Sequence, residues 1–391
     1  MTISDYIKAT PDDYRLQSKD EVANVFGESK NTPLLKGVEF RTETKKFDIM
    51  RQKYSLRFHF KSIGETKSSN LLLKNYKELY NAEYQIDFMA VLLERYSLVL
   101  ESIQIKKNIE FLDSMKSVLE DRIEVLRKIS FISENANLTE IIDTEEKLTD
   151  VELEKIELEN RLNTIELLVV EQTGTEKKVN FYDENLITID ELEKRIEFIE
   201  QNASEQGALF EYRKQRVTLA ESKYKMAKTK THDFFDYVAL EYDTGDWKVP
   251  RNSFSVELSF NLPGVKNSEV DLSRKKADIL EEKLKCEIER KENEKSIRSN
   301  IRSIKRQLKQ YRLILAQNEE SEASNFLDKY TSMEGADPLT ILKIKERVIK
   351  NQMKMQNILF RIYTRYVMLL NLTGVLVHNP DENHLTADGT Q

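Results

Sequence analysis

The sequence predicts a mainly α-helical fold with a small β part, in which a β-hairpin and a long helical hairpin occur together twice. Only 10 glycines and 6 prolines interrupt the 391 residues, and 33% of the residues are charged, a composition typical of long helices. Helical patterns run through stretches of about 65 residues, longer than an ordinary globular helix, and apolar residues in the first of them follow heptad spacing. Features of the first half recur 200 residues later, which indicates a structural duplication.

The first β-hairpin is predicted at residues 37–63. It follows an N-terminal segment, 1–36, of mixed polarity, with one short helix expected at 18–26. Apolar and polar residues alternate from 38 to 42 and again from 54 to 60. This period of two is typical of strands, and the short polar stretch between the two runs makes them a hairpin.

A long helical hairpin is predicted next, at 64–174. One of its seams is formed by residues seven positions apart, at Ile105, Leu112, Leu119 and Leu126. A polar break at 133–137 ends the outgoing helix. The returning helix is about half as long and ends at Thr173-Gly174.

The second half begins with a connector and a helix at 175–229, a part for which the first half has no counterpart of similar length. Thr188, followed closely by two acidic residues, is typical of a helix N-cap, and a break is expected at 201–207. The polar tail at the end of the chain, 375–391, is predicted to be disordered.

A second β-hairpin at 230–263 and a second helical hairpin at 264–374 match the first pair in order and position. Three features recur at an offset of 200 residues. They are the glycine before each long helix, the Thr-Gly pair after each returning helix, and aromatic residues of the second strand of each hairpin. The pairs 200 residues apart are Gly64 and Gly264, Gly174 and Gly374, Tyr54 and Phe254, and Phe60 and Phe260. A fixed offset of this kind indicates that one structural unit is present twice.

This order of elements resembles that of the TolC-type outer-membrane efflux proteins. The most specific segment is 254–263, a strand that ends in proline and enters the long helix. The second tip around Gly335 and the ending Leu372-Thr373-Gly374 resemble the family as well, so the resemblance covers about residues 37–374. It implies a homotrimer, with four strands of each chain in a twelve-stranded outer-membrane β-barrel that continues into a periplasmic α-helical barrel.

The resemblance also implies that the helical tips meet a periplasmic adaptor protein of an efflux pump or a type I secretion system, which an inner-membrane transporter drives. Tyr330, close to the second tip, is a candidate gate. The stretch 341–344 carries no acidic residue, so the acidic constriction that the family often has there is not expected. Adaptor contacts are expected at Asn135, Asn137, Leu138, Met333, Gly335, Asp337 and Leu339.

The strands themselves agree with a membrane barrel, because about 8–10 residues suffice for a tilted transmembrane strand. One face of each strand is apolar and the other is polar, the pattern of a barrel with lipid outside and water inside. Four strands leave two open edges, which only association with other chains can close in lipid. The predicted lipid-facing residues are Tyr54, Leu56, Phe58, Phe60, Phe254, Val256, Leu258 and Phe260.

The opposite strand faces predict a channel lining of mixed charge, with little selectivity between cations and anions. Aromatic residues near the strand ends are expected at the membrane interface, as in barrel girdles, or alternatively in the core of a soluble sheet. The lumen-facing residues are Glu39, Arg41, Glu43, Arg57, Lys61, Glu241 and Glu257. The candidate interfacial aromatics are Phe234, Phe235, Tyr242 and Trp247.

No motif in the sequence indicates catalysis, a cofactor or a metal. The net charge of −7, with acids and bases interspersed, gives no basic footprint for nucleic acid. The four histidines are scattered, no phosphate loop or nucleophile elbow is present, and Cys286 is the single cysteine. We therefore predict a protein that is not an enzyme. Because residues 1–5 lack a signal-peptide pattern, the expected outer-membrane and periplasmic location applies to a mature chain.

One alternative remains open from the sequence. A soluble coiled-coil scaffold, with the hairpins forming a small capping sheet, would also account for the high charge. It accounts poorly for the apolar face on both hairpins and for the repeat at 200 residues. The two hypotheses differ in whether the native protein fractionates with the outer membrane and needs detergent.

Overall fold

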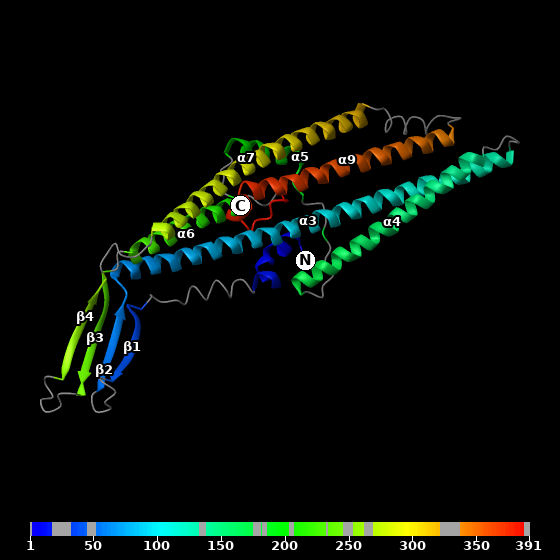
Figure 1. Ribbon diagram of the computed structural model, residues 1–391. Coiled ribbons are helices and arrows are strands. Elements are labelled where there is room, and N and C mark those ends of the chain that lie inside the picture. The colour runs from blue at the N-terminus through cyan, green and yellow to red at the C-terminus, as the bar shows by residue number, and fades with distance from the viewer. Residues whose placement is uncertain are drawn as a thin grey trace. The chain divides into compact units, whose positions relative to one another are not determined.

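The computed structural model is mostly helical with a small antiparallel sheet, as predicted (Figure 1). It divides into two compact units. The sheet unit comprises Ser18–Ile86 and Ala208–Lys291, and the helical unit comprises Met1–Gln17, Asp87–Gly207 and Glu292–Gln391. The residues that the structure describes are 2–17, 33–44, 52–132, 138–174, 181, 186–202, 207–231, 234–244, 253–261, 269–320 and 337–386.

The sheet unit contains one four-stranded antiparallel sheet in the order β1-β2-β3-β4. Both hairpins of the sequence therefore lie side by side in one sheet, with β2 and β3 paired at its centre. The unit also contains α6 (Ala208–Thr231) and the first parts of α3 and α7. The strands are β1 (Leu35–Thr44), β2 (Gln52–Phe60), β3 (Phe235–Asp243) and β4 (Phe254–Phe260).

The helical unit contains the remainder of both long helices and the two helices that return beside them. The leucine and isoleucine seam of α3 is buried, as heptad spacing predicts. The predicted break in the second-half helix at 201–207 separates α5 from α6, although residues 203–206 lie outside the described part of the chain. The helices are α1 (Ile3–Lys8), α3 (Ile63–Ile132), α4 (Leu138–Thr173), α5 (Ile189–Asn202), α7 (Glu269–Glu320), α9 (Pro338–Leu372) and α10 (Val375–His378).

The long helices of this unit form a layer in the order α4-α3-α9-α7 (Figure 1). Ion pairs such as Lys116–Glu152 at 2.7 Å join α3 to α4. A hydrogen bond of 2.8 Å from Gln104 to Asn357 joins α3 to α9, and one of 3.2 Å from Arg365 to Asn300 joins α9 to α7. Helices α4 and α7 are therefore the two edges of the layer.

The duplication appears in the backbone at the ends of the returning helices. Gly174 has φ 61° and Gly374 has φ 76°, the left-handed conformation that favours glycine after a helix. In each case the preceding threonine donates its hydroxyl proton to the carbonyl four residues earlier, at 2.7 Å from Thr173 and 2.9 Å from Thr373. The same terminating device thus occurs twice, 200 residues apart.

The N-terminal segment is anchored to the helical unit, which the sequence patterns do not predict. Arg95 of α3 is fully buried, stacks 4.8 Å from the ring of Tyr6 and donates a hydrogen bond of 2.6 Å to the Tyr6 carbonyl. Its guanidinium also lies 3.5 Å from the buried carboxylate of Asp13, which Arg15 contacts at 2.9 Å. One buried arginine therefore holds the start of the chain in place; the helix expected at 18–26 lies outside the described residues.

The prediction of a disordered tail is wrong for residues 375–386. The tail begins with α10 and then crosses back over the helical unit, where Leu376 and Leu385 are fully buried. The Leu385 carbonyl accepts a hydrogen bond of 2.8 Å from the Ile187 amide, and Leu186 bridges Thr386. The prediction relied on the mainly polar composition of the tail, but a few of its apolar side chains are buried against helices that are distant in sequence. Residues 387–391 lie outside the described part of the chain.

His384 makes the docked tail sensitive to pH. Its ring is buried and forms a hydrogen bond of 3.2 Å between Nε2 and the Asn379 carbonyl, and burial lowers its pKa below the ordinary 6.5. A buried neutral histidine contributes stability that is complete above about pH 6.5 and is lost as the pH falls below that value. We expect the loss to be at most about 1.4 kcal/mol per pH unit.

Chemical denaturation of the wild-type protein and of His384→Gln at several pH values between 5 and 8 measures this contribution. The difference in unfolding free energy between the two should shrink as the pH falls, because only the wild-type loses the histidine contribution. Parallel curves for the two proteins over this range would contradict the assignment.

Candidate functional site

The four strands place their apolar residues in rows that run across the whole sheet. One row is Phe40, Leu56, Leu240 and Val256, and the next is Val38, Phe58, Val238 and Leu258. Each row contains two residues of the first hairpin and the two residues 200 positions later. The predicted lipid-facing residues therefore share one face, together with residues of β1 and β3 that the same alternation could have identified.

Aromatic rows flank this mostly aliphatic centre at both ends of the strands. At one end Tyr242 and Phe254 have ring centroids 4.9 Å apart, in the row that also contains Tyr54. At the other end Phe235 and Phe260 lie 5.8 Å apart. Phe234 packs against Phe260 at this second end, at 5.2 Å. Two aromatic belts around a mostly aliphatic band are typical of strands in transmembrane barrels. Trp247, expected in such a belt, lies outside the described residues.

The opposite face of the sheet is polar and held by ion pairs. Lys53 contacts Glu241 at 2.7 Å, and Arg57 lies 3.8 Å from Glu257 and 4.6 Å from the ring of Tyr237. At the outer strand Arg41 contacts Glu39 at 2.8 Å. All of these residues alternate along the strands with the apolar rows, so the two faces of the sheet differ in polarity.

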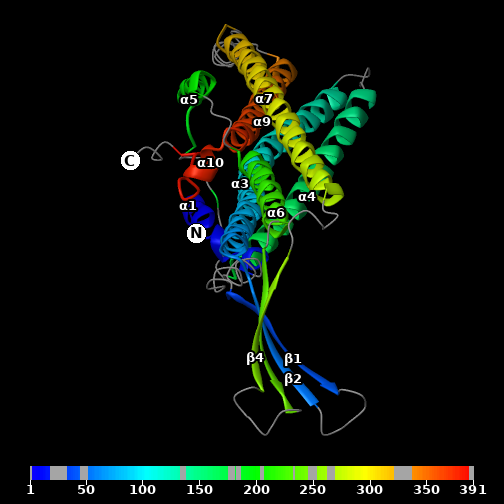
Figure 2. The same cartoon turned by 60° about the vertical axis from the view of Figure 1, so that its left-hand side comes forward.

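The exposure of the two faces is the reverse of that in a soluble sheet. On β3, Leu240 is 50% exposed while its neighbours Ala239 and Glu241 are 0% and 9% exposed, and Val256 on β4 is 66% exposed. Among the described helices of the sheet unit, none lies over either face (Figures 1 and 2). The polar side of the central strands is therefore the crowded side, and the apolar side is open.

Both outer strands of the sheet present unpaired edges. β1 pairs only with β2 and β4 pairs only with β3 among the described strands. A row of unpaired backbone groups next to an apolar face recruits another strand. In an apolar solvent these groups must be paired, because each unsatisfied backbone group costs several kcal/mol, about 2–7.

Three of the predicted tip residues are described, and they lie at helix starts. Leu138 begins α4 and is exposed, and Leu339 follows the first residue of α9. Asp337 caps α9, accepting hydrogen bonds of 3.2 Å from the amides of Leu339 and Thr340. The tip candidates Asn135, Asn137, Met333 and Gly335 and the gate candidate Tyr330 lie outside the described residues.

A buried ion-pair cluster that the sequence analysis missed lies close to these helix starts. Arg122 of α3 contacts Glu140 of α4 at 2.6 Å and Glu346 of α9 at 3.3 Å. Lys343 of α9 also approaches Glu140, at 3.4 Å. Arg122 therefore joins three helices of the layer at one level. No local pattern marks it among so many charged residues, since its partners are distant in sequence.

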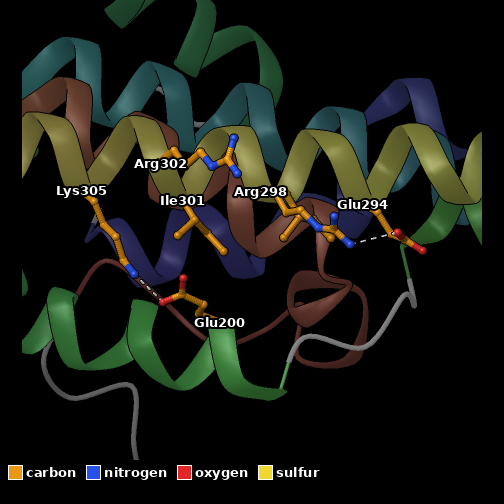
Figure 3. A pocket seen from close by; sticks show the side chains of 7 residues that line it. Glu200, Glu294, Arg298, Ile301, Arg302 and Lys305 are labelled. Carbon is orange, nitrogen blue, oxygen red and sulfur yellow. Dashed lines mark hydrogen bonds and ion pairs between the residues drawn. The ribbon is translucent and has the colours of Figure 1, made fainter.

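A surface groove of about 610 Å³ lies between α5 and α7 in the helical unit (Figure 3). Lys305 of α7 crosses it to contact Glu200 of α5 at 2.6 Å, and Arg312 contacts Glu193 further along. Arg302 also lines the groove but does not point toward Glu200. These ion pairs hold α5 against one side of α7.

The described residues contain no group of histidine, cysteine or carboxylate side chains that could hold a metal ion. In the same part of the chain, no helix combines the length and the apolar character needed to cross a membrane.

Comparisons with known proteins agree on the fold. No protein-family model and no curated protein matches the sequence. The solved outer-membrane channel OprN superposes with a TM-score of 0.69 at 12% identity, over 95% of this chain and 89% of that one. The outer-membrane protein VceC of Vibrio cholerae gives 0.66 at 12% identity, over 95% and 96%. The open-state MtrE outer-membrane channel of Neisseria gonorrhoeae gives 0.61 at 10% identity, over 95% and 88%. The resemblance drawn from the sequence is confirmed at the level of the fold.

Proposed function

We propose, from the premise that this chain has the fold of the TolC-type outer-membrane channels, that it is the outer-membrane exit duct of an export system. Three chains would close one twelve-stranded barrel in the outer membrane, with the long helices forming a tunnel in the periplasm. The duct is passive, because no phosphate loop or other nucleotide motif occurs in the sequence. The energy for export then comes from an inner-membrane transporter.

One observation carries this proposal, namely the reversed polarity of the four-stranded sheet. Its apolar face is open, its polar face is crowded, and both edges are unpaired among the described strands. A sheet of this kind is stable where lipid covers one face, water fills the other, and neighbouring copies pair with the edges. A soluble scaffold would instead need a cover over Leu240, Val256 and Phe254, and no described helix of the sheet unit provides one.

The lining charges fit a conduit of low selectivity. Glu39, Arg41, Arg57, Glu241 and Glu257 face the lumen with both signs. Arg41 pairs with Glu39 on the same strand, Arg57 pairs with Glu257, and Glu241 pairs with Lys53. Paired charges leave a weak net field, so cations and anions pass with similar ease. The remaining candidates for the lining are Glu43 and Lys61.

The adaptor is expected to meet the helical tips. Leu138, Asp337 and Leu339 lie at the starts of the returning helices, next to the segments that contain Asn135, Asn137, Met333, Gly335 and Tyr330. The ion pairs of Arg122 join α3, α4 and α9 just behind these starts. Movement of the helices at this level on adaptor contact would open the tunnel toward its periplasmic end.

Membrane fractionation followed by recording in planar lipid bilayers tests this function. We expect the native protein to sediment with outer membranes, to resist extraction by salt and alkaline washes, and to require detergent. Reconstituted protein should give discrete conductance steps with little preference between K⁺ and Cl⁻. Recovery as a freely soluble monomer or dimer, or reconstitution without conductance, would reject the duct.

A further inference from the structure

The groove between α5 and α7 combines an apolar floor with charged groups of both signs. Its floor is formed by Ile297 and Ile301 of α7, which are 7% and 6% exposed. A volume of about 610 Å³ lies within the range of about 300–1,000 Å³ that is usual for ligand pockets. The groove therefore has the size and the mixed lining of a ligand site. Its charged lining consists of Glu200, Glu294, Arg298, Arg302 and Lys305.

The charges of the groove lie at its two ends, with apolar surface between them (Figure 3). Lys305 contacts Glu200 across one end at 2.6 Å. Arg298 contacts Glu294 at 3.3 Å toward the other end, and Ile301 lies between the two ion pairs. Residues 294 and 305 are about 16 Å apart along the helix axis. A ligand that fits both ends is therefore an extended molecule with separated charges and apolar groups between them.

The charged groups of the groove are available to a ligand. The side chain of Arg298 is 71% exposed, and those of Lys305 and Glu200 are 48% and 43% exposed. Exposed ion pairs contribute little to stability, so their charged ends can turn toward a ligand at small cost. Arg302, one turn from Arg298, makes no hydrogen bond or ion pair with a described residue. Guanidinium groups at this spacing suit carboxylates, which arginine binds through two parallel hydrogen bonds.

The groove opens on the side of the helical layer that carries the short helices. Helices α1, α5 and α10 all lie on one side of the layer formed by α4, α3, α9 and α7 (Figure 2). Three copies of these helices would block the tunnel if that side faced its interior. In the proposed duct this side therefore faces outward, and the groove opens to the periplasm.

We propose that the groove between α5 and α7 binds a peptide stem of the peptidoglycan that surrounds the duct in the periplasm. These stems are short peptides that carry carboxylates, a free amino group and alanine methyl groups. Their carboxylates contact Arg298 and Arg302, and the free amino group contacts Glu200. The methyl groups pack on the apolar floor. The inference rests on the proposed duct and adds a partner in the cell wall.

Sedimentation of the detergent-solubilised protein with isolated peptidoglycan sacculi tests this site. The wild-type protein should sediment with the sacculi, and soluble stem peptides should release it. Arg298→Glu with Arg302→Glu should weaken the binding at least about tenfold. Arg127→Glu with Lys128→Glu changes the net charge equally at exposed positions of α3 outside the groove, and should bind as the wild-type does. Equal losses in the two variants would indicate general charge attraction and overturn the site.

The chemistry of the ligand is tested with stem peptides whose free amino group is acetylated. Acetylation removes the positive charge that Glu200 contacts in the proposed arrangement. The acetylated peptides should therefore bind the wild-type protein at least about fivefold more weakly, as measured by titration calorimetry. Equal affinities of the acetylated and the unmodified peptides would overturn the contact with Glu200 and the proposed orientation of the stem.

A crosslinking test covers the case in which charge reversal disturbs folding or assembly. In a Cys286→Ser background, Arg298→Cys labelled with a benzophenone should become covalently attached to sacculi on irradiation. The same label on Arg127→Cys is the matched control and should give no attachment. Absence of a covalent product from the Arg298→Cys protein would overturn the groove as the binding site.

The outcomes separate this inference from the proposed function. A protein that conducts in lipid bilayers but does not bind sacculi would overturn the peptidoglycan site and leave the duct in place. A protein that neither inserts into outer membranes nor conducts would reject the duct itself, together with the outward orientation on which the site depends.

Discussion

A Leu240→Arg chain is expected to be lost from the outer membrane. Leu240 lies in the centre of the apolar face, paired with Leu56 and Val256 between the two aromatic rows. An arginine at the middle of a lipid-facing barrel strand costs about 2–4 kcal/mol, and a trimer contains three of them. The amount of folded protein in outer-membrane fractions, and its resistance to urea in liposomes, measure the effect.

The matched control uses the same substitution on the opposite face. Ser255 lies on β4 next to Val256, points to the polar side and donates a hydrogen bond of 3.3 Å to Glu241. An arginine at Ser255 would find water and a carboxylate, so Ser255→Arg should insert at close to the wild-type level. Equal insertion of both variants, or a greater loss for Ser255→Arg, would mean that the apolar face does not meet lipid.

Replacing Arg95 with alanine is expected to cause the largest loss of stability in the helical unit. Arg95 donates a hydrogen bond to the Tyr6 carbonyl, stacks on the Tyr6 ring and lies close to the buried carboxylate of Asp13. Removal of one member of a buried ion pair costs about 3–5 kcal/mol, since the other charge stays buried with less compensation. The N-terminal segment should then detach, and limited proteolysis should release it before the helices unfold.

Arg161→Ala is the matched control for this experiment. Arg161 contacts Glu101 at 2.7 Å, but the two side chains are 52% and 33% exposed, so the pair lies at the surface. An exposed pair of this kind contributes about 0–1 kcal/mol, so the unfolding midpoint should hardly change. Similar shifts of the midpoint for Arg95→Ala and Arg161→Ala would show that the buried cluster does not anchor the N-terminus.

The strands could be predicted from the sequence because each of their residues faces one of two opposite environments. Alternation alone therefore places Leu56, Val256 and Phe260 on one face and Arg57 and Glu257 on the other. The heptad seam of α3 was predictable for a similar reason. Both are periodic signals repeated over many residues, and the strand alternation occurs in both halves of the chain.

The docked ends of the chain could not be predicted in this way. Tyr6, Leu16 and Leu385 are buried in sites built by helices that are distant in sequence. Arg95 and Arg122 carry the same charge as the other lysines and arginines of α3, and only their partners distinguish them. The composition of a segment indicates whether most of its residues are exposed to solvent. It does not identify the few buried side chains that hold the segment against the rest of the protein.

A density map of the purified protein in lipid nanodiscs tests the central claim most directly. We predict a threefold ring with twelve strands, in which Leu240 and Val256 contact lipid and Glu241 and Glu257 line a continuous water-filled channel. A single subunit whose own helices cover the Leu240 face, with no central channel, would contradict the account.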